Sequence, residues 1–309
     1  MLDLAIIGGG PAGLTAGLYA TRGGLKDVVM FEMGMPGGQI TGSSEIENYP
    51  GQEKVMSGLD LMQSWPEQAM KFGLKHEMKK ITSVVKNDDI FTLTTEDGNT
   101  YESKAVLLAT GSVPRRAGFK GENEFFGRGI STCATCDGFF YKGKEVAVIG
   151  GGDSALEEAV YLAKICSKVY VVHRRDTYRA APSTIDHMKN TKNIEEVTNV
   201  DVEEVYGDMS GVTGLKVKSK VDGSIKDLPV PGVFVFVGRD VLNEPIKNED
   251  GTFICETNKQ GEVIVDLKMR TSLPGLYAAG DVRIDAAKQV VCAAGDGATA
   301  AVDIIEFLG

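Results

Sequence analysis

Cys133 and Cys136, at Cys-x-x-Cys spacing in the stretch STCATCDGFF, are the side chains of this chain best suited to chemistry. Such a pair can close a small disulfide, and its thiols ionise more readily than a free cysteine thiol. Asp137 follows directly and is placed to act as a general acid for leaving thiolates. Because Asp-Gly is also a common turn pair, Asp137 before Gly138 has an equal claim to be a turn residue. The stretch therefore predicts thiol–disulfide redox chemistry.

A metal site is the alternative use of such a pair. A structural zinc site needs about four ligands. The remaining cysteines, Cys166, Cys255 and Cys292, are isolated, and none of the 3 histidines lies at ligand spacing to the pair. We therefore expect a redox pair and no metal. An odd total of 5 cysteines without a framework of spacings fits a reducing compartment, so we expect a cytoplasmic protein.

A glycine-rich signature near the start of the chain predicts a nucleotide site. The apolar run Leu2–Ile7 stops at Gly8, Gly10 and Gly13, which fit G-x-G-x-x-G, and a helical pattern follows at Leu14–Thr21. These glycines permit a tight turn, close approach of the backbone to a pyrophosphate, and close packing of helix on strand. The next apolar run, Val28–Phe31, ends at Glu32, whose carboxylate can accept hydrogen bonds from ribose hydroxyls.

A second signature begins shortly after the dithiol. Gly150, Gly152 and Ala155 follow the apolar run Glu145–Ile149 and fit G-x-G-x-x-A, while Ser154 and Glu157 have the spacing of a capping box. The next strand, Val169–Val172, ends in His173, Arg174 and Arg175, with Arg179 close behind. Basic residues stand where the first unit has Glu32, and arginine there accommodates a 2′-phosphate. The alternative interpretation of these basic residues is a solvent-exposed edge that binds no ligand. We expect FAD in the first unit and NADPH in the second.

Further glycines punctuate the ends of other apolar strands. Gly37 and Gly38 form a loop that a ligand could approach, Gly111 ends the strand Ala105–Ala109, and Gly280-Asp281 ends Leu276–Ala279. The segments Lys80–Tyr101 and Asn193–Val237 have turn residues typical of β-structure. Other segments are predicted to be a loop at Ser44–Gly51 and helices at Met56–Phe72 and Gln289–Phe307.

The whole chain has the composition of a soluble globular protein, with 309 residues, 42% hydrophobic and 25% charged. That length suits two domains of ordinary size. A net charge of -10 argues against nonspecific binding to nucleic acid, and no apolar run approaches the roughly 20 residues needed to span a bilayer. We also see no basic leader with a cleavage site before the first strand.

Taken together, the motifs resemble those of the low-molecular-weight thioredoxin reductases, and the match covers essentially the whole chain. The motifs that carry the resemblance are GGGPAG at Gly8–Gly13, GGQ at Gly37–Gln39, ATG at Ala109–Gly111, CATCDG at Cys133–Gly138, GGGDSALEEA at Gly150–Ala159, HRRDTYR at His173–Arg179 and GLYAAGDV at Gly275–Val282. Asp153 and Ser154 stand where relatives often have other small polar residues, and Asn243–Cys255 matches no family signature.

The resemblance implies an α/β fold of two Rossmann-like three-layer ββα nucleotide-binding domains. Residues 1–117 and 244–309 would form a discontinuous FAD-binding domain, and residues 118–243 an inserted NADPH-binding domain that carries the dithiol. It also implies a homodimer.

The family's site residues transfer onto matching positions. For FAD they are Gly8, Gly10, Pro11, Ala12, Gly13, Phe31, Glu32, Gly37, Gly38, Gln39, Asn48, Thr110, Gly111, Gly280, Asp281, Lys288, Gln289 and Val290. For NADPH they are Gly150, Gly152, Asp153, Ser154, His173, Arg174, Arg175 and Arg179. Cys136 would face the flavin and Cys133 would attack the partner, an assignment that spacing alone does not make. Arg128, Phe139 and Phe140 match positions near the partner surface, although the two phenylalanines could equally be core residues.

The activity implied is electron transfer from NADPH through FAD and the Cys133–Cys136 disulfide to oxidised thioredoxin, through a transient mixed disulfide. Since nicotinamide and dithiol belong to one domain and must both reach one flavin, we expect a domain rotation during turnover. One alternative is an NADPH-dependent flavin reductase acting on ferredoxin or another small disulfide partner. Another is a nucleotide-bound redox sensor without turnover.

Overall fold

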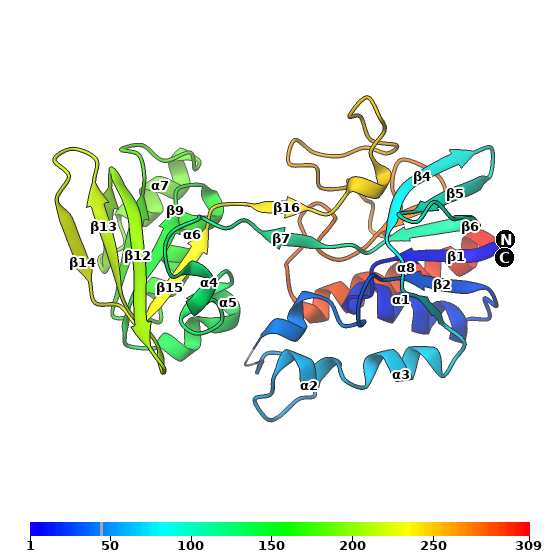
Figure 1. Cartoon of the computed structure of the whole chain (residues 1–309), viewed down its shortest axis with the longest axis horizontal. Coiled ribbons are helices and arrows are strands. Elements are labelled where there is room, and N and C mark those ends of the chain that lie inside the picture. Colours follow the sequence, from blue (N-terminus) through cyan, green and yellow to red (C-terminus); the bar gives the residue numbers. More distant parts are fainter. Residues whose placement is uncertain (44–45) are drawn as a thin grey trace. The chain divides into compact units, whose positions relative to one another are not determined.

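A computed structural model describes residues 1–43 and 46–309 of the chain, which forms two compact units. The first, here called the discontinuous unit, combines Met1–Val113 with Val241–Gly309, and the second, the inserted unit, is Pro114–Asp240. The predicted α/β class is confirmed, since each unit contains parallel strands covered by helices (Figure 1). The predicted loop Ser44–Gly51 begins with two residues that lie outside the described part.

The discontinuous unit is built on a seven-stranded sheet in the order β3-β2-β1-β6-β5-β4, with β17 paired to β6. Its strands are β1 (Leu2–Ile7), β2 (Val28–Phe31), β3 (Lys75–Glu77), β4 (Ile81–Asn87), β5 (Ile90–Thr95), β6 (Thr100–Leu108) and β17 (Leu276–Ala278). The strands β3, β2, β1, β6 and β17 are parallel, whereas β4, β5 and β6 form an antiparallel meander. The near-continuous apolar runs of β1 and β2 suit strands buried on both faces.

Helices cover one face of this sheet (Figure 1). They are α1 (Pro11–Arg22), η1 (Gln39–Gly42), α2 (Gly58–Met62), α3 (Trp65–Met70) and α8 (Val290–Leu308). A Cβ on Gly297 of α8 would lie 2.1 Å from the carbonyl oxygen of Ala12, so α8 and α1 pack with their backbones close together. The expected single helix Met56–Phe72 is two short helices, because Pro66 has no N–H with which to continue the first.

The other face of the sheet is covered partly by residues 244–263, which begin within Asn243–Cys255, the segment for which we found no family signature. After η3 (Glu244–Ile246), two short excursions are closed by isolated bridges between Lys247 and Phe253 and between Thr257 and Val263. Ile246, Cys255 and Val263 are buried in one cluster with residues of β1, β2 and the meander. The segment therefore contributes core to the discontinuous unit.

The inserted unit has a five-stranded parallel sheet in the order β11-β10-β9-β15-β8 and an antiparallel sheet β12-β13-β14. The strands are β8 (Ile130–Ser131), β9 (Glu145–Gly150), β10 (Lys168–His173), β11 (Ile194–Thr198), β12 (Val200–Asp208), β13 (Gly211–Ser219), β14 (Ile225–Leu228) and β15 (Gly232–Phe236). The helical segments are α4 (Glu122–Phe125), α5 (Ala134–Asp137), η2 (Gly138–Tyr141), α6 (Asp153–Ala163) and α7 (Pro182–Lys189). One apolar cluster joins the two sheets, and another joins the parallel sheet to α6, which gives three layers.

The chain passes between the units twice, within β7 (Ser112–Pro114) and β16 (Arg239–Val241), which pair as a two-stranded sheet. Among the described residues, no helix combines the length and apolar character that crossing a bilayer requires.

Candidate active site

The first glycine fingerprint lies where β1 ends and α1 begins. Gly8 has φ 109°, and a Cβ there would lie 2.4 Å from the carbonyl oxygen of Ala109. A Cβ on Gly13 would lie 2.0 Å from the carbonyl oxygen of Gly8, so helix and turn meet through backbone alone. Pro11, with no N–H, occupies the first turn of α1, and Gly10 precedes it as the N-cap residue. The open helix N-terminus that results suits a phosphate.

Two further pieces of backbone close around this turn. The N–H of Gly37 donates to the carbonyl oxygen of Gly9 at 2.8 Å, which lays the second glycine loop on the first. Gly38 has φ 75°, and a Cβ there would meet the Cα of Gly10 at 2.9 Å. The Glu32 carboxylate at the end of β2 accepts from the N–H groups of Gly9 at 2.8 Å and Gly34 at 3.3 Å. The predicted acidic group is thus held beside the fingerprint.

The ends of the neighbouring parallel strands supply the next group of predicted residues. Thr110 lies two residues after the end of β6, and its Oγ1 is buried without a hydrogen-bond partner within the described structure. Gln39 donates from Nε2 to the carbonyl oxygen of Ser112 at 2.6 Å, which holds the loop after Gly111. A buried hydroxyl that lacks a partner is uncommon in folded proteins and calls for an explanation such as a ligand.

Gly280, at the end of β17, is held by two residues that sequence analysis missed. Its N–H donates to Oδ2 of Asp296 at 3.1 Å. Arg283 binds the same carboxylate with two hydrogen bonds, Nε to Oδ2 at 2.6 Å and Nη2 to Oδ1 at 2.9 Å, and Asp296 is buried. This ion pair fixes the Gly280-Asp281 turn against α8. No motif links the two positions, so only the folded chain reveals the pair.

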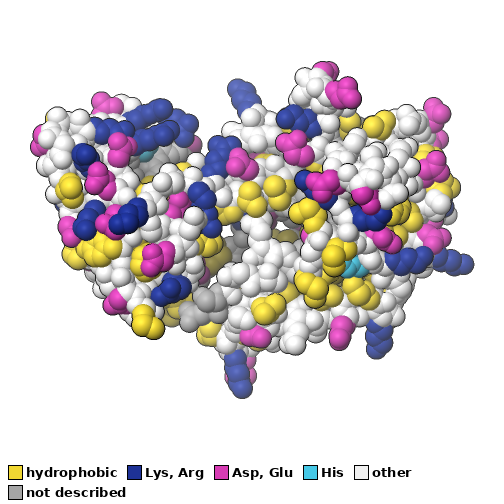
Figure 2. Space-filling view, viewed as in Figure 1, with side chains coloured by type: hydrophobic (Ala, Val, Ile, Leu, Met, Phe, Trp, Pro, Cys, Tyr) yellow, Lys and Arg dark blue, Asp and Glu magenta, His cyan; other side chains and the backbone are white. Residues whose placement is uncertain are grey.

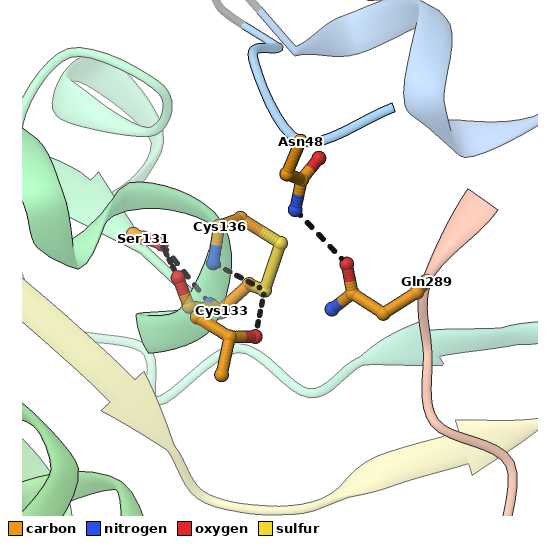
Figure 3. Close-up of a disulfide and its surroundings, with 6 residues drawn as sticks. Asn48, Ser131, Cys133, Cys136 and Gln289 are labelled. Atoms are coloured by element: carbon orange, nitrogen blue, oxygen red, sulfur yellow. Dashed lines mark hydrogen bonds between the residues drawn. A yellow bond between two sulfur atoms is a disulfide. The ribbon is translucent and has the colours of Figure 1, made fainter. Parts of the chain in front are cut away.

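Gln289 is the N-cap residue of α8, directly before Val290. Its side-chain oxygen accepts from Asn48 Nδ2 at 3.1 Å (Figure 3). Lys288 before it has φ 56°, a left-handed conformation that is costly for a residue with a side chain. The structure therefore brings the predicted residues Asn48, Gln289 and Val290 together at one end of α8.

These residues fit a flavin adenine dinucleotide. The glycines of the fingerprint leave no room for side chains, and the Glu32 carboxylate lies at the strand end where a ribose would bind. The buried Thr110 hydroxyl, which has no partner among the described residues, could bond a polar group of the cofactor. The structure brings these predicted residues of the discontinuous unit into one region, because the carboxyl ends of parallel strands meet at one edge of a sheet.

The second fingerprint has the same construction in the inserted unit. Gly150 has φ 158°, and a Cβ there would lie 2.5 Å from the carbonyl oxygen of Phe236 and from the Ala155 side chain. Helix α6 starts at Asp153, with Gly152 as the N-cap residue and no side-chain capping bond. The predicted capping box of Ser154 and Glu157 is therefore wrong, because the helix starts directly after the second glycine and leaves Ser154 inside its first turn.

The basic loop, defined as residues 173–181, follows β10. Arg174, Arg175 and Arg179 are exposed, and no ion pair involves them in residues 1–43 and 46–309. Figure 2 shows Lys and Arg side chains gathered at the end of the inserted unit where α7 lies. The His173 ring is buried and stacks on Tyr178 with centroids 5.2 Å apart. Burial, with the neighbouring arginines, lowers the pKa of His173, so the positive charge of the loop resides on its arginines.

Cys133 and Cys136 form a disulfide with their Cα atoms 5.3 Å apart (Figure 3). Ser131, at the end of β8, accepts from the Cys133 N–H at 3.0 Å and so fixes the start of the motif. The Cys133 sulfur is hydrogen-bonded by the Cys136 N–H at 3.2 Å and lies 3.4 Å from Thr135 Oγ1. Polar groups around Cys133 Sγ would stabilise a thiolate there. The contacts made by Ser131 and Thr135 are further features that spacing did not reveal.

Asp137 ends the short helix α5, and its N–H donates to the Cys133 carbonyl oxygen at 3.2 Å. Phe139 is 59% exposed, which excludes it from the core, and Phe140 is half-buried. Arg128 donates from Nη2 to the carbonyl oxygens of Asp208 and Met209. In the described part of the chain, no group of three or more His, Cys, Asp and Glu side chains is arranged to hold a metal ion.

Comparison with known proteins identifies the family. Residues 2–297 match the model of the pyridine nucleotide-disulphide oxidoreductases. A thioredoxin reductase of Helicobacter pylori is 60% identical over 308 residues, covering 100% of this chain and 99% of the relative, and one of Listeria monocytogenes is 43% identical, covering 96% and 91%. The crystal structure of a thioredoxin reductase from Streptococcus pyogenes, 38% identical, matches with a TM-score of 0.93 over 100% of this chain and 98% of its own. The chain belongs to the pyridine nucleotide-disulphide oxidoreductases and, among them, to the low-molecular-weight thioredoxin reductases.

Proposed function

We propose that this protein is a thioredoxin-disulfide reductase that takes electrons from NADPH through FAD. The observation that carries the proposal is the closed Cys133–Cys136 disulfide in the same unit as a glycine fingerprint followed by a basic loop. A nicotinamide dinucleotide and a dithiol centre on one unit are the parts that disulfide reduction requires. The relatives that match nearly the whole chain carry the name thioredoxin reductase, which supports the same activity.

We assign FAD to the discontinuous unit and NADPH to the inserted unit. Bound in the discontinuous unit, FAD would supply two-electron transfer between the nicotinamide and the disulfide. The fingerprint at Gly8–Gly13 with Glu32 would hold its adenosine half, and Thr110, Asp281 and the Asn48–Gln289 pair would lie toward its ring end. Arg174, Arg175 and Arg179 would bind the 2′-phosphate of NADPH, because their guanidinium groups are exposed and have no carboxylate partner within the described residues.

The dithiol would reduce the partner in two exchange steps. The Cys133 thiolate attacks one sulfur of the thioredoxin disulfide, so that a mixed disulfide forms and one partner thiolate leaves and takes a proton. The Cys136 thiolate then attacks Cys133 Sγ, which re-forms the Cys133–Cys136 disulfide and releases the partner's second thiolate. Asp137 would supply the proton in this exchange. Exposed Phe139, beside the motif, would contact the partner.

The turnover cycle would require a rotation of one domain relative to the other, since the nicotinamide and the dithiol must reach the same flavin in turn. A cross-link that holds the two units together should permit one half-reaction and stop steady turnover. Sustained turnover by the cross-linked protein would contradict the rotation. We further propose a homodimer in the cytoplasm, which light scattering and cell fractionation would check.

The test of the activity is a thioredoxin-coupled assay with NADPH and with NADH, on the wild type and on Cys136→Ser. We expect NADPH to be preferred and the variant to lose thioredoxin reduction while it keeps bound flavin. If the variant still reduced protein disulfides, the assignment of the pair would be wrong and a flavin reductase acting on ferredoxin would gain support. A purified protein that neither carries nor binds FAD would overturn the whole proposal.

A further inference from the structure

The basic loop of the inserted unit is tied to the glycine fingerprint by its backbone. The N–H of Arg179 donates to the carbonyl oxygen of Gly151 at 2.8 Å. At its other end the His173 ring packs on Gly151 so closely that a Cβ there would lie 2.2 Å from a ring carbon. The two segments that would meet the pyrophosphate and the 2′-phosphate are therefore in direct contact with each other.

Asp153 adds a third link between these segments. Its Oδ1 accepts hydrogen bonds from the Ala181 N–H at 2.7 Å and from Thr184 Oγ1 at 3.2 Å. Ala181 is the N-cap residue of α7 and has no side-chain acceptor, and Pro182 after it has no N–H. The carboxylate of Asp153 thus ties the first turn of α6 to the start of α7, and it anchors the end of the basic loop.

The negative charge of Asp153 argues against a direct contact between its carboxylate and the dinucleotide phosphates. The carboxylate belongs to the first turn of α6, at the end of the helix where a pyrophosphate would bind, and like charges repel. Direct repulsion would weaken every dinucleotide alike, whereas anchoring of the basic loop would favour the dinucleotide with a 2′-phosphate. Removal of the carboxylate should therefore raise the affinity for dinucleotides if repulsion dominates, and lower the affinity for the 2′-phosphorylated one if anchoring dominates.

We propose that Asp153 is a positioning residue for cofactor specificity: by holding Ala181 and Thr184 it fixes Arg174, Arg175 and Arg179 for a 2′-phosphorylated dinucleotide. This inference rests on the proposed function and deepens it. A loop that is already ordered before binding loses less conformational entropy when the phosphate arrives. The preference for NADP(H) over NAD(H) is therefore a property of the anchored loop as well as of its three guanidinium groups.

The experiment measures binding of NADP⁺ and of NAD⁺ to the full-length, FAD-loaded protein by isothermal titration calorimetry. For Asp153→Ala we expect the affinity for NADP⁺ to fall about tenfold, as expected for the loss of one or two ordering hydrogen bonds, and that for NAD⁺ to change less than about twofold. Asp153→Asn keeps an oxygen acceptor and should recover most of the affinity for NADP⁺. Thr184→Val removes only the longer bond and should give a smaller loss in the same direction.

Glu157→Ala is the matched control. Glu157 lies one turn further along α6, is exposed, and has no hydrogen-bond or ion-pair partner within the described residues, so its removal changes the charge without touching the loop. We expect it to leave the ratio of the two affinities unchanged. Circular dichroism checks that each variant is folded, and Thr184→Val tests the anchor independently if Asp153→Ala does not fold.

The outcomes separate this inference from the proposed function. A wild type without preference for NADP⁺ overturns both. A wild-type preference that persists in Asp153→Ala, an equal loss for both dinucleotides, or tighter binding of both overturns the anchoring role alone and leaves the reductase assignment intact.

Discussion

The cysteines of this chain fall into two chemical kinds. Cys133 and Cys136 are joined in a partly exposed turn, whereas Cys166 and Cys255 are free and buried. Burial raises the pKa of each of these two buried thiols to about 11, against about 8.5 for a free cysteine. Since alkylation requires the thiolate, Cys166 and Cys255 are expected to react slowly in the folded, reduced protein.

We predict that iodoacetamide at pH 8 labels Cys166 and Cys255 in the native protein about a hundredfold or more slowly than after unfolding, because about one thiol in a thousand is ionised at that pH. Because the thiolate fraction rises about tenfold per pH unit below the pKa, labelling of the two buried thiols should accelerate with pH until about pH 11 and then level off. Mass spectrometry of the alkylated peptides makes the measurement, with the half-buried Cys292 as an internal comparison. Equal labelling rates in native and unfolded protein would contradict the prediction.

The unpartnered hydroxyl of Thr110 gives a second prediction at this scale. Thr110→Val removes a buried polar atom that has no hydrogen-bond partner among the described residues, so the FAD-free protein should keep its stability or gain up to about 1 kcal/mol. If the hydroxyl serves the flavin, FAD should bind several-fold more weakly. Thermal unfolding of the FAD-free protein and titration with FAD measure the two effects, and Thr110→Ser is the control. Unchanged FAD affinity would show that the hydroxyl does not serve the cofactor.

At the scale of elements, the packing of α8 on α1 depends on one glycine. A Cβ on Gly297 would meet the Ala12 backbone, whereas Gly295 in the same helix has open space around it. We predict that Gly297→Ala destabilises the discontinuous unit by about 1–3 kcal/mol, because the helices must move apart. Gly295→Ala should be neutral or stabilising by up to about 1 kcal/mol through helix propensity. Thermal unfolding compares the pair, and equal effects would refute the packing argument.

A cluster of polar side chains joins the second half of α8 to β17. Asp303 is buried and accepts from Arg270 Nη2 at 2.6 Å, from Lys268 Nζ at 2.8 Å and from the Tyr277 hydroxyl at 2.9 Å. These donors, Arg270 first, hold the pKa of Asp303 well below its usual value of 3.8. A carboxyl group with a lowered pKa stabilises the fold at pH values above the unfolded pKa, and the stabilisation is lost as the pH falls through that value toward the folded pKa.

We therefore predict that Asp303→Asn destabilises the protein at pH 7 by about 2 kcal/mol, and that the difference from the wild type narrows below about pH 4. Denaturant unfolding of both proteins at a series of pH values measures this difference in the free energy of unfolding. Glu306→Gln is the control, because its pair with Lys268 is exposed and should contribute little. A difference that stayed constant from pH 7 to pH 3 would show that the charge of Asp303 is not the cause.

For the whole molecule, the sequence predicted the α/β class, the strand and helix around each fingerprint and the dithiol, because each is a local pattern of apolar runs, glycines and cysteine spacing. It could not predict the Arg283–Asp296 pair or the bonds of Asp153, since both depend on where loops lie after the chain has folded. The break between α2 and α3 could have been predicted from Pro66, but the apolar periodicity of Met56–Phe72 favoured a single helix. The buried face of Asn243–Cys255 depends on the sheet beneath it.

The paired strands β7 and β16 determine how easily the inserted unit could be exchanged in evolution or by engineering. On the inserted side, the Arg115 N–H donates to the Gly238 carbonyl oxygen at 3.0 Å, and on the other side the Leu242 N–H donates to the Gly111 carbonyl oxygen at 3.0 Å. The chain segment that enters the inserted unit and the segment that leaves it are therefore hydrogen-bonded to each other within each unit. The coding segment for Pro114–Asp240 could therefore be exchanged for another domain, or deleted and its two ends joined by a short peptide. In this way the flavin-binding unit could acquire a new electron acceptor without changes to its own sequence.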